Sequence, residues 1–174
     1  MRWDIYFLRI AKEVSERTKC LSRKVGAVLV YDKSIISTGY NGPPRGIKRC
    51  EEREPSFYWE LDDGKTELSS ETAYKDICPR RKLNYKSGQG LHLCQAGHAE
   101  RNALINAARL GISTLGSTMY CYCALPCLPC MIEIINAGVE RLVYLKGSDY
   151  HKYSRVLLEE SKMEYTEYFV DEIK

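Results

Sequence analysis

The chain has 174 residues, which suits one domain with a core large enough to fold alone. Hydrophobic residues make up 44% of it, charged residues make up 28%, and the net charge is only +3, as in a globular protein. This balance neither drives nor excludes nucleic-acid binding, and the sequence has no Lys/Arg block typical of a polyanion-binding tail. No apolar run approaches the ~20 residues of a membrane helix, and the early acid Asp4 argues against a secretory signal. We therefore expect a cytoplasmic protein that does not bind membranes.

The first forty residues are predicted to form a helix and a hairpin. Apolar side chains recur at helical spacing over residues 3–18, which predicts an amphipathic helix ending near Thr18. The β-branched run 25–31 predicts a buried strand. A turn at 32–34 and a second strand at 35–40 would complete the hairpin. The glycine- and proline-rich residues 41–46 follow as a rigid loop.

Residues 47–95 are polar, mixed in charge and without periodic apolar faces, which predicts a long insertion beneath the helix that follows. Beyond it, the pattern alternates between helices and strands. The predicted elements are a helix at 99–110, a strand at 117–123, a helix at 127–137, a strand at 141–145, a helix at 152–161 and a strand at 164–170. This order predicts a three-layer α/β/α fold, a mixed five-stranded sheet with helices on both faces. We expect one domain over residues 1–174, with its insertion at about 47–95.

Two stretches carry side chains suited to a metal. His98-Ala99-Glu100 lies 29 positions before Cys127, and Cys130 follows one helical turn later. One His and two Cys close three sides of a tetrahedral zinc and leave a fourth position for water. Zinc lowers the pKa of such a water to about 7, and Glu100 could move protons beside the metal without binding it. The residues around Pro126 have the form of a helix start, which lowers thiol pKa values.

Other interpretations of these residues exist. A single C-x-x-C can be a redox pair or part of a structural zinc ribbon, and a single His is usually only packed. Glu100 favours catalysis, because a closed structural site has no use for that carboxylate. Eight cysteines would suit a disulfide scaffold in a secreted chain. Without a signal peptide, metal ligands and buried thiols explain them better.

These residues resemble the deoxycytidylate deaminase family, within the cytidine deaminase superfamily. H-x-E followed by P-C-x-x-C is the signature of zinc-dependent base deaminases. Residues 20–28 resemble the family's opening strand, residues 39–46 its G-Y-N-G-x-P-x-G loop, and residues 98–103 its H-A-E-x-N-A helix start. The resemblance runs from about residue 5 to 145, and residues 51–90 match poorly. It implies a cytidine deaminase-like fold and hydrolytic deamination of dCMP to dUMP, which supplies thymidylate synthesis.

The resemblance also implies roles for single residues. His98, Cys127 and Cys130 would be the catalytic zinc ligands, Glu100 the proton shuttle, and Asn41 the contact to the sugar. For the 5′-phosphate the adjacent pair Arg23 and Lys24 is our candidate. Tyr150 is a weaker one, because residues 146–151 carry a small insertion relative to the family. Alternatively, Asn41 is a turn residue that tolerates a left-handed conformation, and Arg23 and Lys24 form an ordinary solvated pair at a strand edge.

A second, structural zinc under the insertion is a further implication of the resemblance. Cys121 and Cys123 are assigned to strand packing, which leaves four cysteines beyond the catalytic pair: Cys20, Cys50, Cys78 and Cys94. Four thiolates would close a structural tetrahedron, and the bound metal would stabilise a core-poor insertion. His92 is the substitute if one Cys is not a ligand. The alternative is free buried cysteines, which pack as small hydrophobic residues.

Finally, the resemblance implies a homo-oligomer, a dimer or hexamer, that responds to dCTP and dTTP, with Mg²⁺ accompanying the nucleotide effector. One alternative is a deaminase acting on a base in tRNA or single-stranded DNA, for which residues 80–86 are the one local basic and aromatic cluster. Others are a deaminase of a free pterin or guanine-like base, and a non-catalytic zinc-stabilised binding module. The N-G-x-P-x-G loop and the small size favour a free nucleotide, so we expect no nucleic-acid partner.

Overall fold

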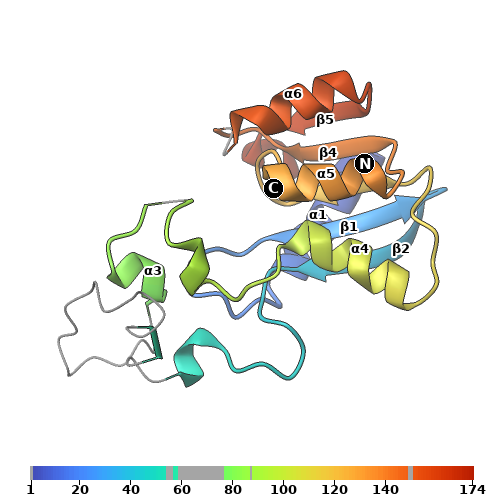
Figure 1. The fold of residues 1–174 in the computed structure, drawn as a ribbon. Coiled ribbons are helices and arrows are strands. Elements are labelled where there is room, and N and C mark those ends of the chain that lie inside the picture. Colours follow the sequence, from blue (N-terminus) through green and yellow to red (C-terminus); the bar gives the residue numbers. More distant parts are fainter. Residues whose placement is uncertain (1, 54–56, 59–76, 87, 149–150) are drawn as a thin grey trace. The chain divides into compact units, whose positions relative to one another are not determined.

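The computed structural model describes residues 2–53, 57–58, 77–86, 88–148 and 151–174, which belong to two compact units (Figure 1). The first, here named the sheet unit, comprises Met1–Thr18, Lys24–Asn41 and His98–Lys174. The second, named the insertion unit, comprises Lys19–Arg23 and Gly42–Gly97. None of the described helices combines the length and apolarity needed to cross a membrane.

The sheet unit is built on a five-stranded sheet in the order β2-β1-β3-β4-β5. Its strands are β1 (Gly26–Tyr31), β2 (Ser34–Tyr40), β3 (Thr118–Cys121), β4 (Arg141–Leu145) and β5 (Glu164–Tyr168). The β1 strand pairs antiparallel with β2 and β3, whereas β3, β4 and β5 run parallel. The helices are α1 (Trp3–Ser15), α4 (Ala99–Arg109), α5 (Leu128–Asn136) and α6 (Lys152–Glu160), and the 3₁₀ turn η3 (Val170–Ile173) ends the chain.

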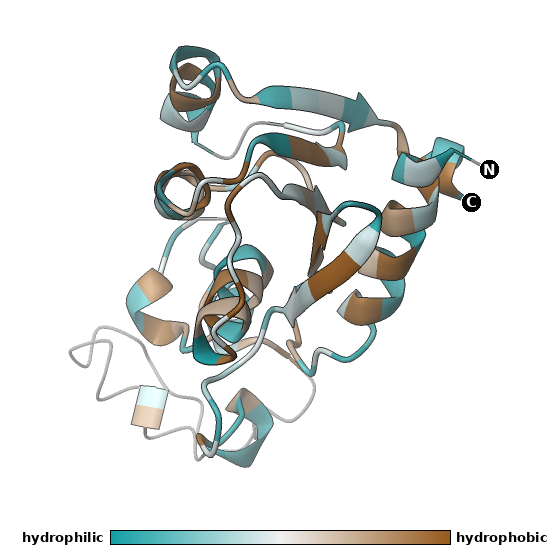
Figure 2. Ribbon diagram, turned by 90° about the vertical axis from the view of Figure 1, so that its right-hand side faces the viewer, coloured by the Kyte–Doolittle hydropathy of each residue, from teal (hydrophilic) through white to brown (hydrophobic). Residues whose placement is uncertain are grey.

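Helices cover both faces of the sheet. Neighbouring residues of the inner strands therefore pack into two different cores, one on each face. Val28 of β1 belongs to a cluster with Phe7 of α1, whereas Leu29 belongs to a cluster with Ala103 of α4 and Met131 of α5. Such a strand is apolar at nearly every position, as the sequence indicated. Figure 2 shows α1 on one side of the sheet and α4, α5 and α6 opposite, with the inner strands hydrophobic and the edge strand β5 mainly hydrophilic. The predicted fold class is confirmed.

The hairpin turn is tighter than predicted. Asp32 and Lys33 have φ angles of 44° and 59°, the left-handed conformation that a two-residue turn between antiparallel strands requires. The second strand therefore begins at Ser34 rather than at residue 35.

Helix α4 lies directly on β2. A Cβ atom at Gly39 would stand 2.2 Å from the carbonyl oxygen of Ala99 and 2.3 Å from the nitrogen of Ala103, so only glycine permits this approach. The side-chain amides of Asn102 and Asn106 donate hydrogen bonds of 2.8 and 2.9 Å to backbone carbonyls of β2. These contacts fix the beginning of α4, which carries His98 and Glu100.

Two predicted strand ends are wrong. The strand predicted at 117–123 ends at Cys121, and the one predicted at 164–170 ends at Tyr168, where η3 follows. The apolar pattern continues through Cys123, but there the chain has to leave β3 to begin α5. Cys123 therefore lies in the β3–α5 connection and not in a strand.

The insertion unit contains only short elements among its described residues: η1 (Cys50–Glu52), α3 (Pro79–Lys82) and η2 (Leu91–Leu93). Gly42 and Gly97, at the two ends of the long segment, form a bridge with reciprocal backbone hydrogen bonds of 3.1 and 2.8 Å. The assignment of residues 47–95 as an insertion within one domain stays a prediction. The expected place of this insertion beneath the helix also stays a prediction.

Candidate metal centre and active site

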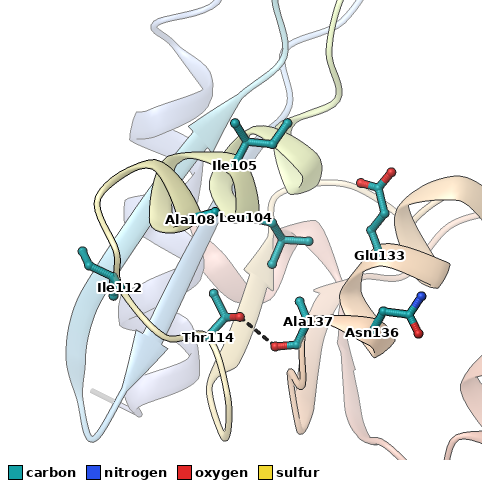
Figure 3. A pocket seen from close by; sticks show the side chains of 8 residues that line it. All are labelled: Leu104, Ile105, Ala108, Ile112, Thr114, Glu133, Asn136 and Ala137. Atoms are coloured by element: carbon teal, nitrogen blue, oxygen red, sulfur yellow. Dashed lines mark hydrogen bonds between the residues drawn. The ribbon is translucent and has the colours of Figure 1, made fainter.

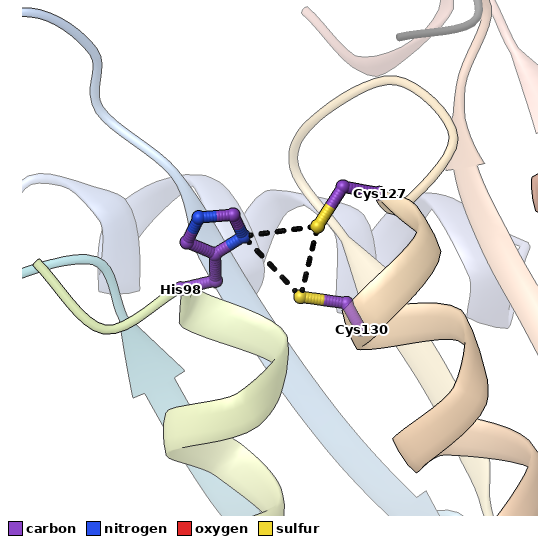
Figure 4. A group of neighbouring side chains, drawn as sticks. All are labelled: His98, Cys127 and Cys130. Atoms are coloured by element: carbon purple, nitrogen blue, oxygen red, sulfur yellow. Dashed lines mark hydrogen bonds between the residues drawn. The ribbon is translucent and has the colours of Figure 1, made fainter. Parts of the chain in front are cut away.

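Three side chains from the beginnings of two helices meet in the sheet unit (Figure 4). His98 is the N-cap residue of α4, Cys127 is the N-cap residue of α5, and Cys130 lies in the first turn of α5. The Nδ1 atom of His98 lies 3.2 Å from the Sγ atom of Cys127 and 3.3 Å from that of Cys130, and the two sulfurs are 3.5 Å apart. Within the described ranges, this is the group of ligand atoms close enough to share one ion.

The cluster has the dimensions and chemistry of a zinc site. With Zn–S bonds of about 2.3 Å and Zn–N bonds of about 2.0 Å, the ligand atoms of a tetrahedral site are about 3.5–3.8 Å apart. The observed separations lie within a few tenths of an ångström of these values. Both cysteines are buried, whereas His98 keeps contact with solvent. Three ligands on the protein and one accessible side are typical of catalytic zinc.

The cysteine pair is set up to bind a cation. The hydrogen bond with Cys130, followed by that with His98, lowers the pKa of Cys127 to about 4. The neighbouring Cys127 in turn raises the pKa of Cys130. One thiolate thus forms readily, and the second needs a nearby positive charge, which a divalent metal supplies.

Glu100 is a buried carboxylate in the first turn of α4, two residues after His98. It is only 4% exposed, and this burial raises its pKa. The charge of His98 lowers this pKa and that of Cys127 raises it, which agrees with the position of Glu100 two residues after a ligand of the cluster. Its Oε1 atom accepts a hydrogen bond from the Cys123 thiol at 3.8 Å. A carboxylate whose pKa is shifted toward neutral pH can both take up and release a proton.

Asn41 closes the end of the β1–β2 hairpin. Its Oδ1 accepts a hydrogen bond from the backbone nitrogen of Val25 at 2.9 Å, and its backbone nitrogen donates to the carbonyl of Val25 at 3.2 Å. Thr18 donates its hydroxyl to the carbonyl of Asn41. Asn41 is not among the described residues with positive φ, so the left-handed turn proposed as an alternative is wrong. Its contact to a sugar stays a prediction.

The structure does not group the phosphate candidates around one point. Lys24 forms an ion pair with Glu16 in which both side chains are at least half exposed, so that pair contributes little stability. Arg23 belongs to the insertion unit and Lys24 to the sheet unit. Tyr150 lies outside the described residues. All three assignments stay predictions.

The four cysteines predicted for a structural zinc all belong to the insertion unit. Burial raises the pKa of the Cys50 thiol, and the thiols of Cys78, Cys94 and Cys20 act on that pKa in the same direction. In the described part of the chain, however, their sulfurs are not packed as closely as the catalytic group. His92, the predicted substitute, packs edge-on against the ring of Tyr85 at 6.0 Å.

The basic residues 80–86 are partly used within the insertion unit. Arg80 donates from Nε to the carbonyl of Gln89 at 2.7 Å, and Arg81 donates from Nη2 to the carbonyl of Ser22 at 3.1 Å. Guanidinium groups held in this way are less available to bind a nucleic-acid strand.

A separate hollow of about 370 Å³ lies between α4 and α5 (Figure 3). Its walls are mostly apolar, with Leu104 and Ile105 from α4 and Ala137 after α5. Neither the metal cluster nor Glu100 lines it. The hollow lacks the metal ligands and the buried carboxylate, so it is not the candidate active site.

Sequence reasoning missed two residues near the cluster. The imidazole of His151, the N-cap residue of α6, accepts a hydrogen bond at 3.0 Å from the backbone nitrogen of Leu128, the first residue of α5. It therefore fixes the start of the helix that carries Cys127 and Cys130. The other missed residue is Cys123, which was assigned to strand packing. No sequence spacing indicates either contact.

Residues 1–146 match the model of a protein family described as the cytidine and deoxycytidylate deaminase zinc-binding region. The chain belongs to this family. The resemblance inferred from the motifs is thus confirmed, and the family's zinc binding agrees with the His98, Cys127 and Cys130 cluster.

Several relatives of this chain are known. A deoxycytidylate deaminase of Schizosaccharomyces pombe is 31% identical over 171 residues, which cover 98% of this chain and 45% of that protein. The deoxycytidylate deaminase of Mycobacterium phage D29 is 35% identical over 151 residues, 84% of this chain and 96% of that one. The crystal structure of a dCMP deaminase from the cyanophage S-TIM5, in complex with dCMP and dUMP, superposes with a TM-score of 0.66 at 26% identity. The superposition covers 97% of this chain and 99% of the phage chain.

The chain spans less than half the length of two fungal relatives, 45% of the Schizosaccharomyces pombe protein and 37% of a deoxycytidylate deaminase of Saccharomyces cerevisiae.

Proposed function

We propose that this chain is a zinc-dependent hydrolase that converts dCMP and water into dUMP and ammonia. The observation that carries the proposal is the placement of a buried carboxylate, Glu100, beside a three-ligand metal cluster with one accessible side. A structural zinc site would use four protein ligands and no such acid. The relatives named deoxycytidylate deaminase and the cyanophage enzyme crystallised with dCMP and dUMP support the choice of substrate.

In this proposal His98, Cys127 and Cys130 hold the zinc. When bound, zinc supplies a Lewis acid and a water activated at neutral pH. Glu100 takes up the proton that the water loses and returns it to the substrate, so that nitrogen leaves as ammonia. Its burial favours this role, because a desolvated carboxylate binds a proton more readily than an exposed one.

Asn41 is proposed to contact the sugar, and Arg23, Lys24 and Tyr150 are candidates for the 5′-phosphate. The hydrogen bonds that Val25 makes with the side chain and the backbone of Asn41 support a fixed position for this residue. For the basic pair the support is chemical, since a phosphate needs fixed cationic donors.

We also propose that the insertion unit binds a structural zinc through Cys20, Cys50, Cys78 and Cys94 within one deaminase domain. The effect of the Cys78, Cys94 and Cys20 thiols on the pKa of Cys50 supports this, and a metal would stabilise a unit with so few regular elements among its described residues. Metal analysis of the purified chain should return two zinc ions per chain. One zinc per chain would contradict the second site.

The remaining proposals follow from family membership alone. They are a homo-oligomer, either dimer or hexamer, regulation by dCTP and dTTP with Mg²⁺ on the nucleotide effector, and a cytoplasmic location.

The test of substrate is a single panel. The purified zinc-loaded chain is incubated with dCMP, cytidine, dCTP and a single-stranded oligonucleotide, and released ammonia is measured. We expect dCMP to be the best substrate. Preferred release from the oligonucleotide would support a nucleic-acid deaminase, and no release from any of them would support a binding module.

A further inference from the structure

The Cys123 thiol is hydrogen-bonded to the Glu100 carboxylate, although the two residues belong to different elements of the fold. Cys123 follows β3, and Glu100 lies in the first turn of α4. The Sγ atom donates a hydrogen bond to Oε1 at 3.8 Å, an ordinary length for a sulfur donor. The contact therefore links the β3–α5 connection to the helix that carries the proposed proton shuttle.

A buried carboxylate needs hydrogen-bond donors, because its desolvation is otherwise uncompensated. Glu100 has a backbone N–H of its own turn as one donor. In the part of the chain that the structure describes, Cys123 is the side chain that donates to this carboxylate. The thiol thus restricts the rotation of the Glu100 carboxylate, which would otherwise be held only by the backbone N–H.

Cys123 is itself held in place. The backbone nitrogen of Leu145 in β4 donates to the carbonyl of Cys123 at 2.8 Å, and the nitrogen of Tyr122 donates to the carbonyl of Gly26 in β1 at 2.8 Å. The connection is thus hydrogen-bonded to two strands of the sheet. The backbone that carries the thiol is therefore fixed relative to the sheet.

The thiol also remains a donor at neutral pH. The hydrogen bond with Cys121, burial and the neighbouring Glu100 together raise the pKa of Cys123 well above its ordinary value. Since the protonated form is the donor, the contact persists in the range where the enzyme would work.

We propose that Cys123 is a positioning residue that orients the Glu100 carboxylate for proton transfer. The inference rests on the proposed function, since it requires Glu100 to be the proton shuttle. A thiol suits the task because it is a weak donor. It fixes one oxygen and leaves the other for the reaction, whereas a Lys or Arg at the same place would hold the carboxylate permanently ionised.

The test compares Cys123→Ala with Cys123→Ser in dCMP turnover. The alanine variant should lower kcat by about fivefold, the loss expected for one weak hydrogen bond, with KM within about twofold of wild type. The serine variant keeps a donor of similar size and should recover most of kcat. Equal losses in the alanine and serine variants, or a rise in KM at unchanged kcat, would overturn the proposal.

A second measurement does not depend on turnover. Crystal structures of the zinc-bound wild type and of Cys123→Ala should show one Glu100 rotamer in the former and more than one in the latter. A single, unchanged rotamer in the variant refutes a positioning role. If the wild type releases no ammonia from dCMP, the proposed function fails, and the rotamer comparison still decides whether Cys123 orients Glu100.

Discussion

The strongest stability prediction concerns Asp4, which ties α1 to three strands of the sheet. Its carboxylate accepts two hydrogen bonds from Arg141 of β4, at 2.7 and 2.8 Å, and one each from the hydroxyls of Tyr120 and Tyr168, both at 3.0 Å. The side chains of Asp4 and Arg141 are only 17% and 27% exposed. Asp4→Ala would therefore leave a largely buried guanidinium and two hydroxyls without this partner.

The expected cost follows from this burial. Breaking a fully buried ion pair costs about 3–5 kcal/mol, and the residual exposure of this pair places Asp4→Ala at the lower end, about 3 kcal/mol. Asp4→Asn retains one acceptor oxygen and the side-chain shape, so about 2 kcal/mol is expected. Glu16→Ala is the matched control, because it breaks the exposed ion pair with Lys24 and should cost less than about 1 kcal/mol.

The effect should depend on pH in a defined direction. The hydrogen bonds from Arg141 lower the pKa of Asp4 below the value of about 3.9 that it has in an unfolded chain. Its stabilisation is thus fully present above about pH 4 and is lost as the pH falls through the lower folded-state pKa. Urea unfolding at pH 7 and at about pH 3 measures both effects. The reasoning is refuted if Asp4→Ala costs no more than Glu16→Ala at pH 7, or if the difference from wild type grows on acidification.

Three further predictions test the proposed site. Glu100→Gln should retain the catalytic zinc in metal analysis and lower kcat for dCMP by a factor of about 10²–10⁴, the usual contribution of a general acid–base group; a loss of less than tenfold would contradict the shuttle role. Cys127→Ala should lose one zinc per chain together with its activity, since two ligands remain, and wild-type metal content would contradict its assignment as a ligand. Arg23→Glu should lower kcat/KM for dCMP by about tenfold or more and leave deoxycytidine unaffected. Unchanged selectivity for the monophosphate would show that Arg23 does not bind the phosphate.

The sequence predicted those elements whose apolar run and both of whose ends are marked by neighbouring residues. The strand at 141–145 was placed correctly, because an apolar run follows a helix that Gly138, with its φ of 72°, prevents from continuing. The strand at 117–123 was predicted too long, because Tyr122 and Cys123 continue the apolar pattern of β3. Where a strand ends depends on the path of the next connection, and hydrophobic periodicity does not record that path.

At the site, too, the sequence predicted what depends on local spacing and missed what depends on the path of a loop. His98, Cys127 and Cys130 could be predicted because motif spacing places each at a helix beginning. The contact between Cys123 and Glu100 could not, since it joins residues 23 positions apart through the course of a loop. Individual contacts of this kind are tertiary and carry no sequence signature.

The position of the metal cluster follows from the sheet topology. The β3 strand leads into α5, and β4 runs parallel beside β3, so the start of α5 lies at the carboxyl end of these strands, where ligand sites of parallel sheets form. The start of α4 is brought to the same place by its contact with β2 through Gly39. His98 and Glu100 are separated by one residue on that helix, so a displacement of α4 moves the metal ligand and the carboxylate together. Activity should therefore respond to any change that separates α4 from β2, even when every chemical group remains present.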